Sequence, residues 1–131
     1  MPQFVVVYLA IGIVFFALDF CWLAVASGRL YRPRLGALLT ARPRLEIAGL
    51  FYLLYVAGIA LLAVMPNANN EWWMTSASGA LLGLVAYGTY DFTNLATLRG
   101  WSVAVTVADL AWGTALTALG ATAGHLALAL S

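Results

Sequence analysis

The fold is decided by one stretch of the chain, residues 4–26, which reads FVVVYLAIGIVFFALDFCWLAVA. It contains a single charged side chain, Asp19, and no proline. As an α-helix rising about 1.5 Å per residue, a stretch of this length reaches across the roughly 30 Å of hydrocarbon in a bilayer. The stretch is therefore predicted to be a membrane-spanning helix.

Three further apolar stretches follow, at residues 47–65, 73–98 and 103–130. Pro66 ends the second stretch, and Gly100 separates the third from the fourth. The apolar runs are continuous rather than alternating, which argues against the strands of a membrane β-barrel. We expect an all-α protein, an integral membrane four-helix bundle that occupies residues 1–131 as a single transmembrane domain.

The composition supports a membrane protein and excludes other classes. Of the 131 residues, 64% are hydrophobic and 8% are charged, and lysine is absent, whereas a soluble domain carries about 25% charged residues. A formal net charge of +1 argues against a nucleic-acid partner, because such binders neutralise phosphates with many basic side chains. With one cysteine and one histidine, we expect neither a metal nor another cofactor.

The arginines predict how the helices are oriented. Five of the six lie between the first two expected spans, in a predicted loop at 27–46, and Arg99 lies between the third and fourth. The positive-inside rule places both loops in the cytoplasm and both termini outside. Two readings of the loop stay open: a clamp for anionic lipid headgroups, or a topology signal with ordinary lipid contact. In the first interpretation, the residues that bind the headgroup are Arg32, Arg34, Arg42 and Arg44.

Each span except the second carries one aspartate: Asp19, Asp91 or Asp109. Measured along the helices, all three lie roughly 10 to 12 Å inside the cytoplasmic boundary. An ionised side chain facing lipid at such a depth costs about 2.5 to 3.5 kcal/mol. The three aspartates are therefore expected to face inward and to form a single layer.

Two of these aspartates lie in similar surroundings. Residues 19–24 read DFCWLA and residues 91–96 read DFTNLA. The match is consistent with an ancient duplication of a helical hairpin, which would place Asp19 and Asp91 at equal depth.

The neighbours of the aspartates complete a candidate site. The expected ligand-binding or proton-coupling residues are Asp19, Asp91, Asn94, Asp109, Tyr87, Tyr90, Trp22 and Trp112. Asn94, Tyr87 and Tyr90 would orient a ligand, and the two tryptophans would supply apolar or cation-π walls. Tyr52 and Tyr55 lie within two turns of the start of the second span, and their hydroxyls reach the same layer. Three carboxylates in a low dielectric cannot all stay ionised unless a cation enters.

Three functions fit these residues. The leading hypothesis is a cytoplasmic-side cavity that binds a small cationic or amphiphilic ligand and couples its binding or transport to aspartate protonation. A transporter of this size should be a homo-oligomer. The second is a membrane-embedded enzyme that uses one aspartate as acid and another as base on a lipid or hydrophobic substrate. The third is a structural or assembly subunit, in which each aspartate only hydrogen-bonds a partner on a crossing helix, such as the indole of Trp22 or Trp112.

Several motifs resemble a known family. Residues 89–101 read TYDFTNLATLRGW and residues 107–114 read VADLAWGT. These motifs, together with Leu18-Asp19-Phe20, Trp22-Leu23 and the segment 31–36, resemble the bacterial family known as domain of unknown function 2177. The resemblance covers essentially the whole chain. It implies a small, multi-pass protein of the bacterial inner (plasma) membrane with four predicted spans, in contact with membrane lipid, and it implies no activity. The family's characteristic polar positions correspond to Asp19, Asp91, Asn94 and Asp109.

Overall fold

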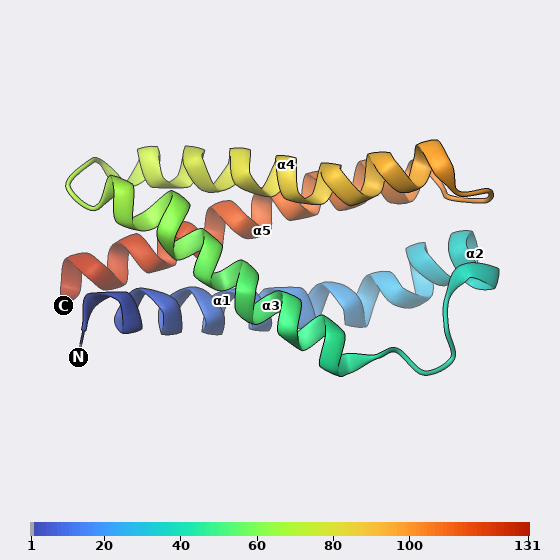
Figure 1. Cartoon of the computed structure of the whole chain (residues 1–131), viewed down its shortest axis with the longest axis horizontal. Helices are drawn as coiled ribbons and strands as arrows, with labels where there is room; N and C mark the ends of the chain where they lie inside the picture. The colour runs from blue at the N-terminus through green and yellow to red at the C-terminus, as the bar shows by residue number, and fades with distance from the viewer. Residues whose placement is uncertain (1) are drawn as a thin grey trace.

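The computed structural model describes residues 2–131, and this part of the chain folds into four helical rods joined by short turns (Figure 1). The all-α prediction is confirmed. The helices are α1 (Gln3–Ala26), α2 (Arg32–Leu35), α3 (Leu45–Ile59), α4 (Trp72–Thr97) and α5 (Val103–Leu130). A π-helical turn, Ser27–Tyr31, joins α1 to α2, which ends in a 3₁₀ turn, Gly36–Leu38. A second π-helical turn, Ala60–Val64, and a 3₁₀ turn, Met65–Asn67, extend α3.

Three of the four rods are long and apolar enough to cross a membrane, namely Gln3–Leu38, Leu45–Asn67 and Val103–Leu130. The fourth rod, α4, has 26 residues but is less apolar. Some of its hydroxyls donate to carbonyls of its own preceding turn, as Thr89 does to Val85 (2.6 Å) and Thr97 does to Thr93 (2.7 Å). These bonds satisfy the hydroxyl groups within the helix itself.

Residues 27–46 were expected to form a loop, but a large part of this segment is helical. It stays helical through Leu38, and only the stretch between Leu38 and Leu45 leaves the helical path. Proline normally breaks a helix, because it lacks the N–H and its ring clashes with the preceding turn. Here each π-helical turn lies just before a proline, Pro33 in the first rod and Pro66 in the second. The wider turn shifts the hydrogen-bond register ahead of the proline, so the rod continues.

Helices α4 and α5 pack closely against each other. A Cβ atom on Gly79 would lie 2.8 Å from the Cβ of Ala121, so this position accepts only glycine without movement. Gly83 likewise faces the backbone of Gly113 and the side chain of Thr117. These small residues therefore form an interface between the two helices.

The remaining helices cover this pair. In Figure 1, α1 runs alongside α5, and α3 crosses α1 obliquely, approaching α4 at one end and diverging from it at the other. The largest fully buried apolar side chains are Phe15, Ile11, Ile59, Leu116, Val7, Val56, Val64 and Val105.

The two ends of the bundle differ in character. Both termini lie at one end, and α2 and the turn between α4 and α5 lie at the other (Figure 1). We call the latter the arginine end, because it holds residues 29–44 and Arg99. Gly100 turns the chain there with a positive φ of 79°.

Candidate functional site

All three aspartates face the interior of the bundle. Asp19 is 7% exposed, Asp109 is 3% exposed and Asp91 is fully buried. The phenylalanines that follow two of them, Phe20 and Phe92, point outward and are mostly exposed. The two Asp-Phe pairs of the repeat thus place their side chains alike, with the acid inside and the ring outside.

Asp19 on α1 receives two hydrogen bonds from aromatic donors. The hydroxyl of Tyr52 on α3 donates to Oδ2 at 2.5 Å, and the indole Nε1 of Trp112 on α5 donates to Oδ1 at 3.1 Å. Bonds from polar donors stabilise the charged form of a buried carboxyl and compensate for its lost hydration. Asp19 therefore ties three helices together.

Asp109 on α5 is held in the same manner. Tyr31, at the end of the first π-helical turn, donates to Oδ1, and Tyr90 on α4 donates to Oδ2 at 2.9 Å. The hydroxyl of Tyr31 in turn accepts a hydrogen bond from Nε1 of Trp22 at 3.0 Å. Tyr31 is the last residue of the π-helical turn. The turn therefore determines where the hydroxyl of Tyr31 lies relative to Asp109.

The two aspartates are connected through a pair of tryptophans. On α1 and on α5 a tryptophan follows the aspartate by three residues, so both side chains lie on one helix face. Trp22 and Trp112 stack on each other between the helices. Trp112 donates a hydrogen bond to Asp19 of α1. Trp22 donates one to Tyr31, which in turn donates to Asp109 of α5. The expectation that an indole bonds an aspartate is confirmed for Asp19, whereas both donors to Asp109 are tyrosines.

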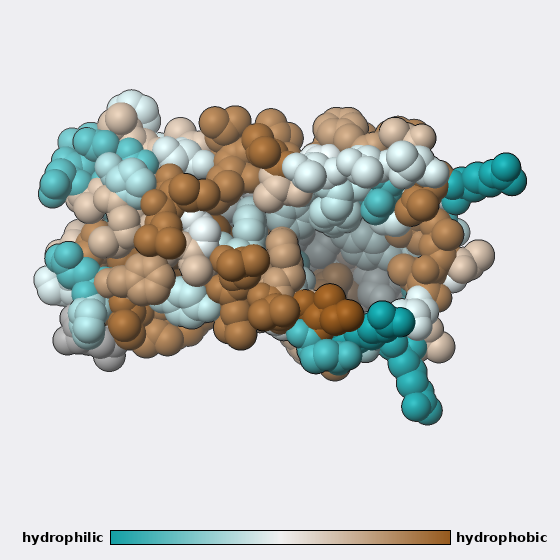
Figure 2. Space-filling view, in the orientation of Figure 1, coloured by the Kyte–Doolittle hydropathy of each residue, from teal (hydrophilic) through white to brown (hydrophobic). Residues whose placement is uncertain are grey.

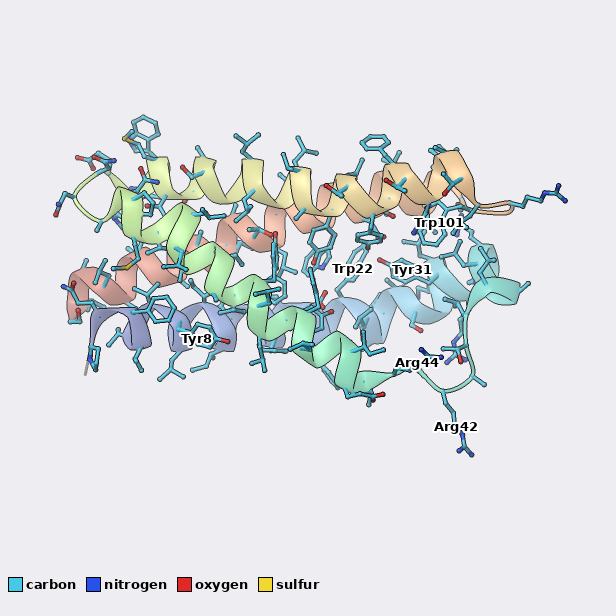
Figure 3. The ribbon with its side chains drawn as sticks, in the orientation of Figure 1. Tyr8, Trp22, Tyr31, Arg42, Arg44 and Trp101 are labelled. Carbon is cyan, nitrogen blue, oxygen red and sulfur yellow. The ribbon has the colours of Figure 1, made fainter. Side chains whose placement is uncertain are left out.

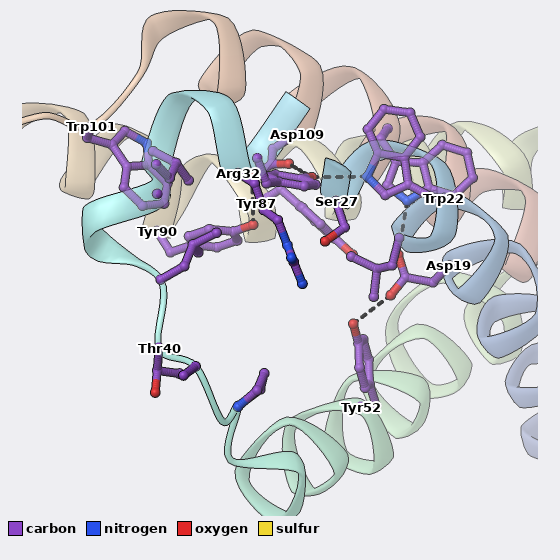
Figure 4. A pocket seen from close by; sticks show the side chains of 18 residues that line it. Asp19, Trp22, Ser27, Arg32, Thr40, Tyr52, Tyr87, Tyr90, Trp101 and Asp109 are labelled. Carbon is purple, nitrogen blue, oxygen red and sulfur yellow. Dashed lines mark hydrogen bonds between the residues drawn. The ribbon is translucent and has the colours of Figure 1, made fainter. Parts of the chain in front are cut away.

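A cavity of about 800 Å³ lies beside this network at the arginine end (Figure 4). Seven of its 18 lining residues are aromatic, and both hydrogen-bonded aspartates also line it. Its lining includes Asp19, Trp22, Ser27, Tyr31, Arg32, Tyr52, Tyr87, Tyr90, Trp101, Asp109 and Trp112. Figure 2 shows the hollow on the side of the molecule, between α4 and the beginning of α3, with pale, weakly polar residues inside and brown apolar residues at its rim. We call it the aspartate cavity.

A second hollow adjoins the first. It has a volume of about 430 Å³ and is lined by Phe16, Ala17, Asp19, Phe20, Leu23 and Tyr52. Three of these residues, Asp19, Leu23 and Tyr52, also line the aspartate cavity. Apart from Asp19 and the hydroxyl of Tyr52 its walls are apolar, and we call it the apolar groove.

The third aspartate takes no part in the cavity. Asp91 does not line it, and neither of its carboxyl oxygens has a hydrogen-bond partner within residues 2–131. Asp91 instead neighbours Asp109 and Tyr90 inside the bundle. Asn94 is half-buried on the same helix and also lies outside the lining. The layer expected from the sequence is thus divided between two aspartates at the cavity and one behind it.

Of the four arginines expected at a headgroup, one lines the cavity. Arg32 points into it (Figure 4), whereas Arg34 bonds the carbonyl of Arg29 at 3.4 Å. Arg42 and Arg44 are exposed on the connecting segment, with Arg42 directed away from the molecule (Figure 3). In the part of the chain that the structure describes, no basic group lies within 4.0 Å of an acidic one.

Some lining residues were not among those predicted. Tyr31, Ser27 and Trp101 lie beyond the expected ends of the spans, so periodicity within the spans could not find them. Tyr52 was expected to reach the layer with its hydroxyl, and its bond to Asp19 confirms this. Tyr55 instead shares a hydrogen bond with Thr117 at 2.8 Å.

The chain was compared with known protein families, curated proteins and solved structures. A family model described as "Predicted membrane protein (DUF2177)" matches residues 4–126. No curated protein and no solved structure matches the chain.

Proposed function

We propose that this chain, which belongs to the DUF2177 family of predicted membrane proteins, binds an amphiphile drawn from the surrounding membrane. The polar head occupies the aspartate cavity, and the apolar tail lies in the groove. The observation that carries this proposal is the junction of the two hollows, where Asp19, Leu23 and Tyr52 line both. A cavity that holds carboxylates and hydroxyls and adjoins an apolar groove fits a molecule with a polar and an apolar part.

The chemistry of the two hollows supports this division. Phe16, Phe20 and Leu23 in the groove are exposed on the outside of α1, where lipid surrounds them. A tail that moves from lipid into such a groove gains little free energy, because both surroundings are apolar. Affinity and selectivity must then come from the head, and the aspartate cavity supplies the carboxylates, hydroxyls and aromatic faces for it.

The position of the cavity suits entry from the membrane. The hollow opens on the side of the bundle rather than at its tip (Figure 2), and its lining reaches the arginine end. By the positive-inside rule we assign this end to the cytoplasmic face, with both termini outside. A lipid in the cytoplasmic leaflet would then slide sideways into the site without crossing water.

The aspartates offer a route to proton coupling. Each carboxyl accepts two hydrogen bonds from aromatic donors, which leaves acceptor positions on Asp19 and Asp109 for a cationic head. A cation and a proton would then compete for the same carboxylates, which couples ligand binding to proton release. Transport, as opposed to binding, requires more than one thin bundle, and for it we expect a homo-oligomer.

Native mass spectrometry of the protein released from membrane vesicles tests the proposal. Leu23→Trp fills the junction of the two hollows and should reduce the retained amphiphile at least about tenfold, a loss of roughly 1.4 kcal/mol in binding. Leu62→Trp, at a lipid-exposed position on the extension of α3, is the control and should retain as much as the wild type. Equal retention by the Leu23→Trp variant and the wild type would rule out the proposed site.

A further inference from the structure

The aspartate cavity is lined by side chains of opposite charge that do not pair. Arg32 lies on one wall, and Asp19 and Asp109 lie on others. Within residues 2–131 no guanidinium nitrogen lies within 4.0 Å of a carboxylate oxygen. Opposite charges attract each other, less strongly for an exposed side chain such as Arg32, and their separation also has a structural cause.

The hydrogen-bond network provides that cause. Tyr52 and Trp112 hold both oxygens of Asp19, and Tyr31 and Tyr90 hold both oxygens of Asp109. Arg32 starts α2, which continues the α1 rod, and its side chain extends into the hollow in Figure 4. The scaffold thus keeps a positive and a negative group apart across open space.

The negative side of the cavity suits an ammonium group. An ionised carboxylate offers about four acceptor positions, and Asp19 and Asp109 each use two. The stacked rings of Trp22 and Trp112 and the half-buried ring of Tyr87 lie beside them. Aromatic faces next to carboxylates attract organic cations through their π electrons and through charge.

The positive side suits a phosphate group. A guanidinium presents a planar set of N–H donors that matches two phosphate oxygens at once. Ser27 lines the same cavity one helical turn from Arg32 in the sequence, and its hydroxyl adds a neutral donor. No acidic oxygen of residues 2–131 lies within 4.0 Å of a nitrogen of Arg32, so its N–H donors are free to bind a ligand.

We propose that the amphiphile is a zwitterionic phospholipid, whose ammonium group faces Asp19 and Asp109 and whose phosphate faces Arg32. This inference rests on the proposed function and names its ligand class. A cavity of about 800 Å³ is within the roughly 300 to 1,000 Å³ of small-molecule sites. The apolar groove at Leu23 then receives an acyl chain.

Three lipids with identical acyl chains test the headgroup in nanodiscs, with bound lipid counted by native mass spectrometry. The first carries phosphoethanolamine, the second phosphoglycerol without an amine, and the third a trimethylammonium group without phosphate. The wild type should retain the zwitterionic lipid about tenfold more than either of the others, equivalent to roughly 1.4 kcal/mol. Equal retention of all three lipids would overturn the inference that the ligand is zwitterionic. It would leave the proposed binding of an amphiphile in place.

Substitutions test which residues bind the phosphate and the ammonium group of the lipid. Arg32→Gln should erase the preference for the zwitterionic lipid over the ammonium lipid, and Arg32→Lys should restore part of it, because lysine keeps the charge without the planar donor set. Asp19→Asn should erase the preference over the phosphoglycerol lipid. Arg34→Gln is the matched control, since Arg34 lies two residues from Arg32 but outside the lining. An unchanged preference in Arg32→Gln would overturn the inference.

Two further measurements distinguish a bound lipid from a soluble metabolite and from an empty site. Soluble phosphoethanolamine, which has the same head and no tail, should compete far less than the lipid; equal competition would assign the cavity to a free metabolite and overturn the lipid class. Loss of all lipid discrimination together with equal retention by Leu23→Trp would instead contradict the proposed function itself. The two failures are therefore distinguishable.

Discussion

The indole rings of Trp22 and Trp112 stack with their centroids 4.8 Å apart and their planes inclined by 10°. Each ring follows an aspartate of its own helix by three residues and donates its N–H to a residue beyond that helix: Trp112 bonds Asp19, and Trp22 bonds Tyr31. The stack therefore joins two buried carboxyl groups into one network between α1 and α5.

Trp112→Phe should weaken this network while keeping its aromatic surface. The variant removes the donor to Oδ1 of Asp19 and leaves a buried carboxylate oxygen without a partner. Losing a bond to a charged group costs about 1.5 to 3 kcal/mol, so the melting temperature in detergent should fall. Trp73→Phe, at an exposed position on the opposite end of the bundle, should leave it unchanged. Equal melting temperatures for the two variants would show that the indole donor is dispensable.

Gly83→Ala should separate α4 from α5. A Cβ atom at this position collides with the carbonyl of Gly113 and the side chain of Thr117, and overpacking of this kind costs about 1 to 3 kcal/mol. Gly58→Ala on α3 meets no atom within 4 Å and should be neutral or slightly stabilising, because alanine favours a helix more than glycine does. Chemical or thermal denaturation of the two variants side by side measures the difference, and a stable Gly83→Ala variant would contradict the close packing.

Gly113→Ala should disturb ligand binding through Tyr87. A Cβ atom on Gly113 would overlap the ring of Tyr87 and force it to move within the lining of the cavity. Gly120→Ala is the matched control on the same helix, since its nearest neighbour, Ile11, lies at an ordinary contact distance of 3.5 Å. We expect retained lipid to fall several-fold in the first variant and to stay constant in the second. Retention that is equal in both would show that Tyr87 does not shape the site.

Asp91→Asn should be tolerated, in contrast to Asp19→Asn. Asp91 is fully buried with no donor to either oxygen among the described residues, and a buried polar group without a hydrogen-bond partner costs about 1 to 3 kcal/mol. Asparagine has nearly the same shape and adds an N–H donor beside the neighbouring Asp109. We expect the melting temperature of Asp91→Asn to equal or exceed that of the wild type. A fall as large as that of Asp19→Asn would mean that Asp91 has a partner of equal importance.

The residues within the spans could be predicted because a bilayer restricts what a helix can contain. A carboxyl group in hydrocarbon must face inward, so Asp19, Asp91 and Asp109 were correctly expected in the interior. Two of the aromatic partners, Trp22 and Trp112, follow from the helical period alone.

The rest depends on features that periodicity does not reveal. The π-helical turn before Pro33 extends the first rod and brings Tyr31 and Arg32 over the cavity, although their sequence predicts a loop. The exclusion of Asp91 and Asn94 from the lining depends on how α4 rotates against α5, and helical spacing alone places them on the same broad face as Tyr87. The apolar groove forms from the crossing of α3 over α1, which no local pattern encodes.

Photo-crosslinking with a zwitterionic phospholipid that carries a diazirine in its acyl chain tests the central claim most directly. After irradiation in membrane vesicles, adducts should concentrate on Phe16, Phe20 and Leu23 of α1, and excess unlabelled lipid should remove them. Adducts spread evenly over exposed apolar positions such as Leu61 and Leu81, with no effect of the competitor, would mean that the lipid merely surrounds the bundle.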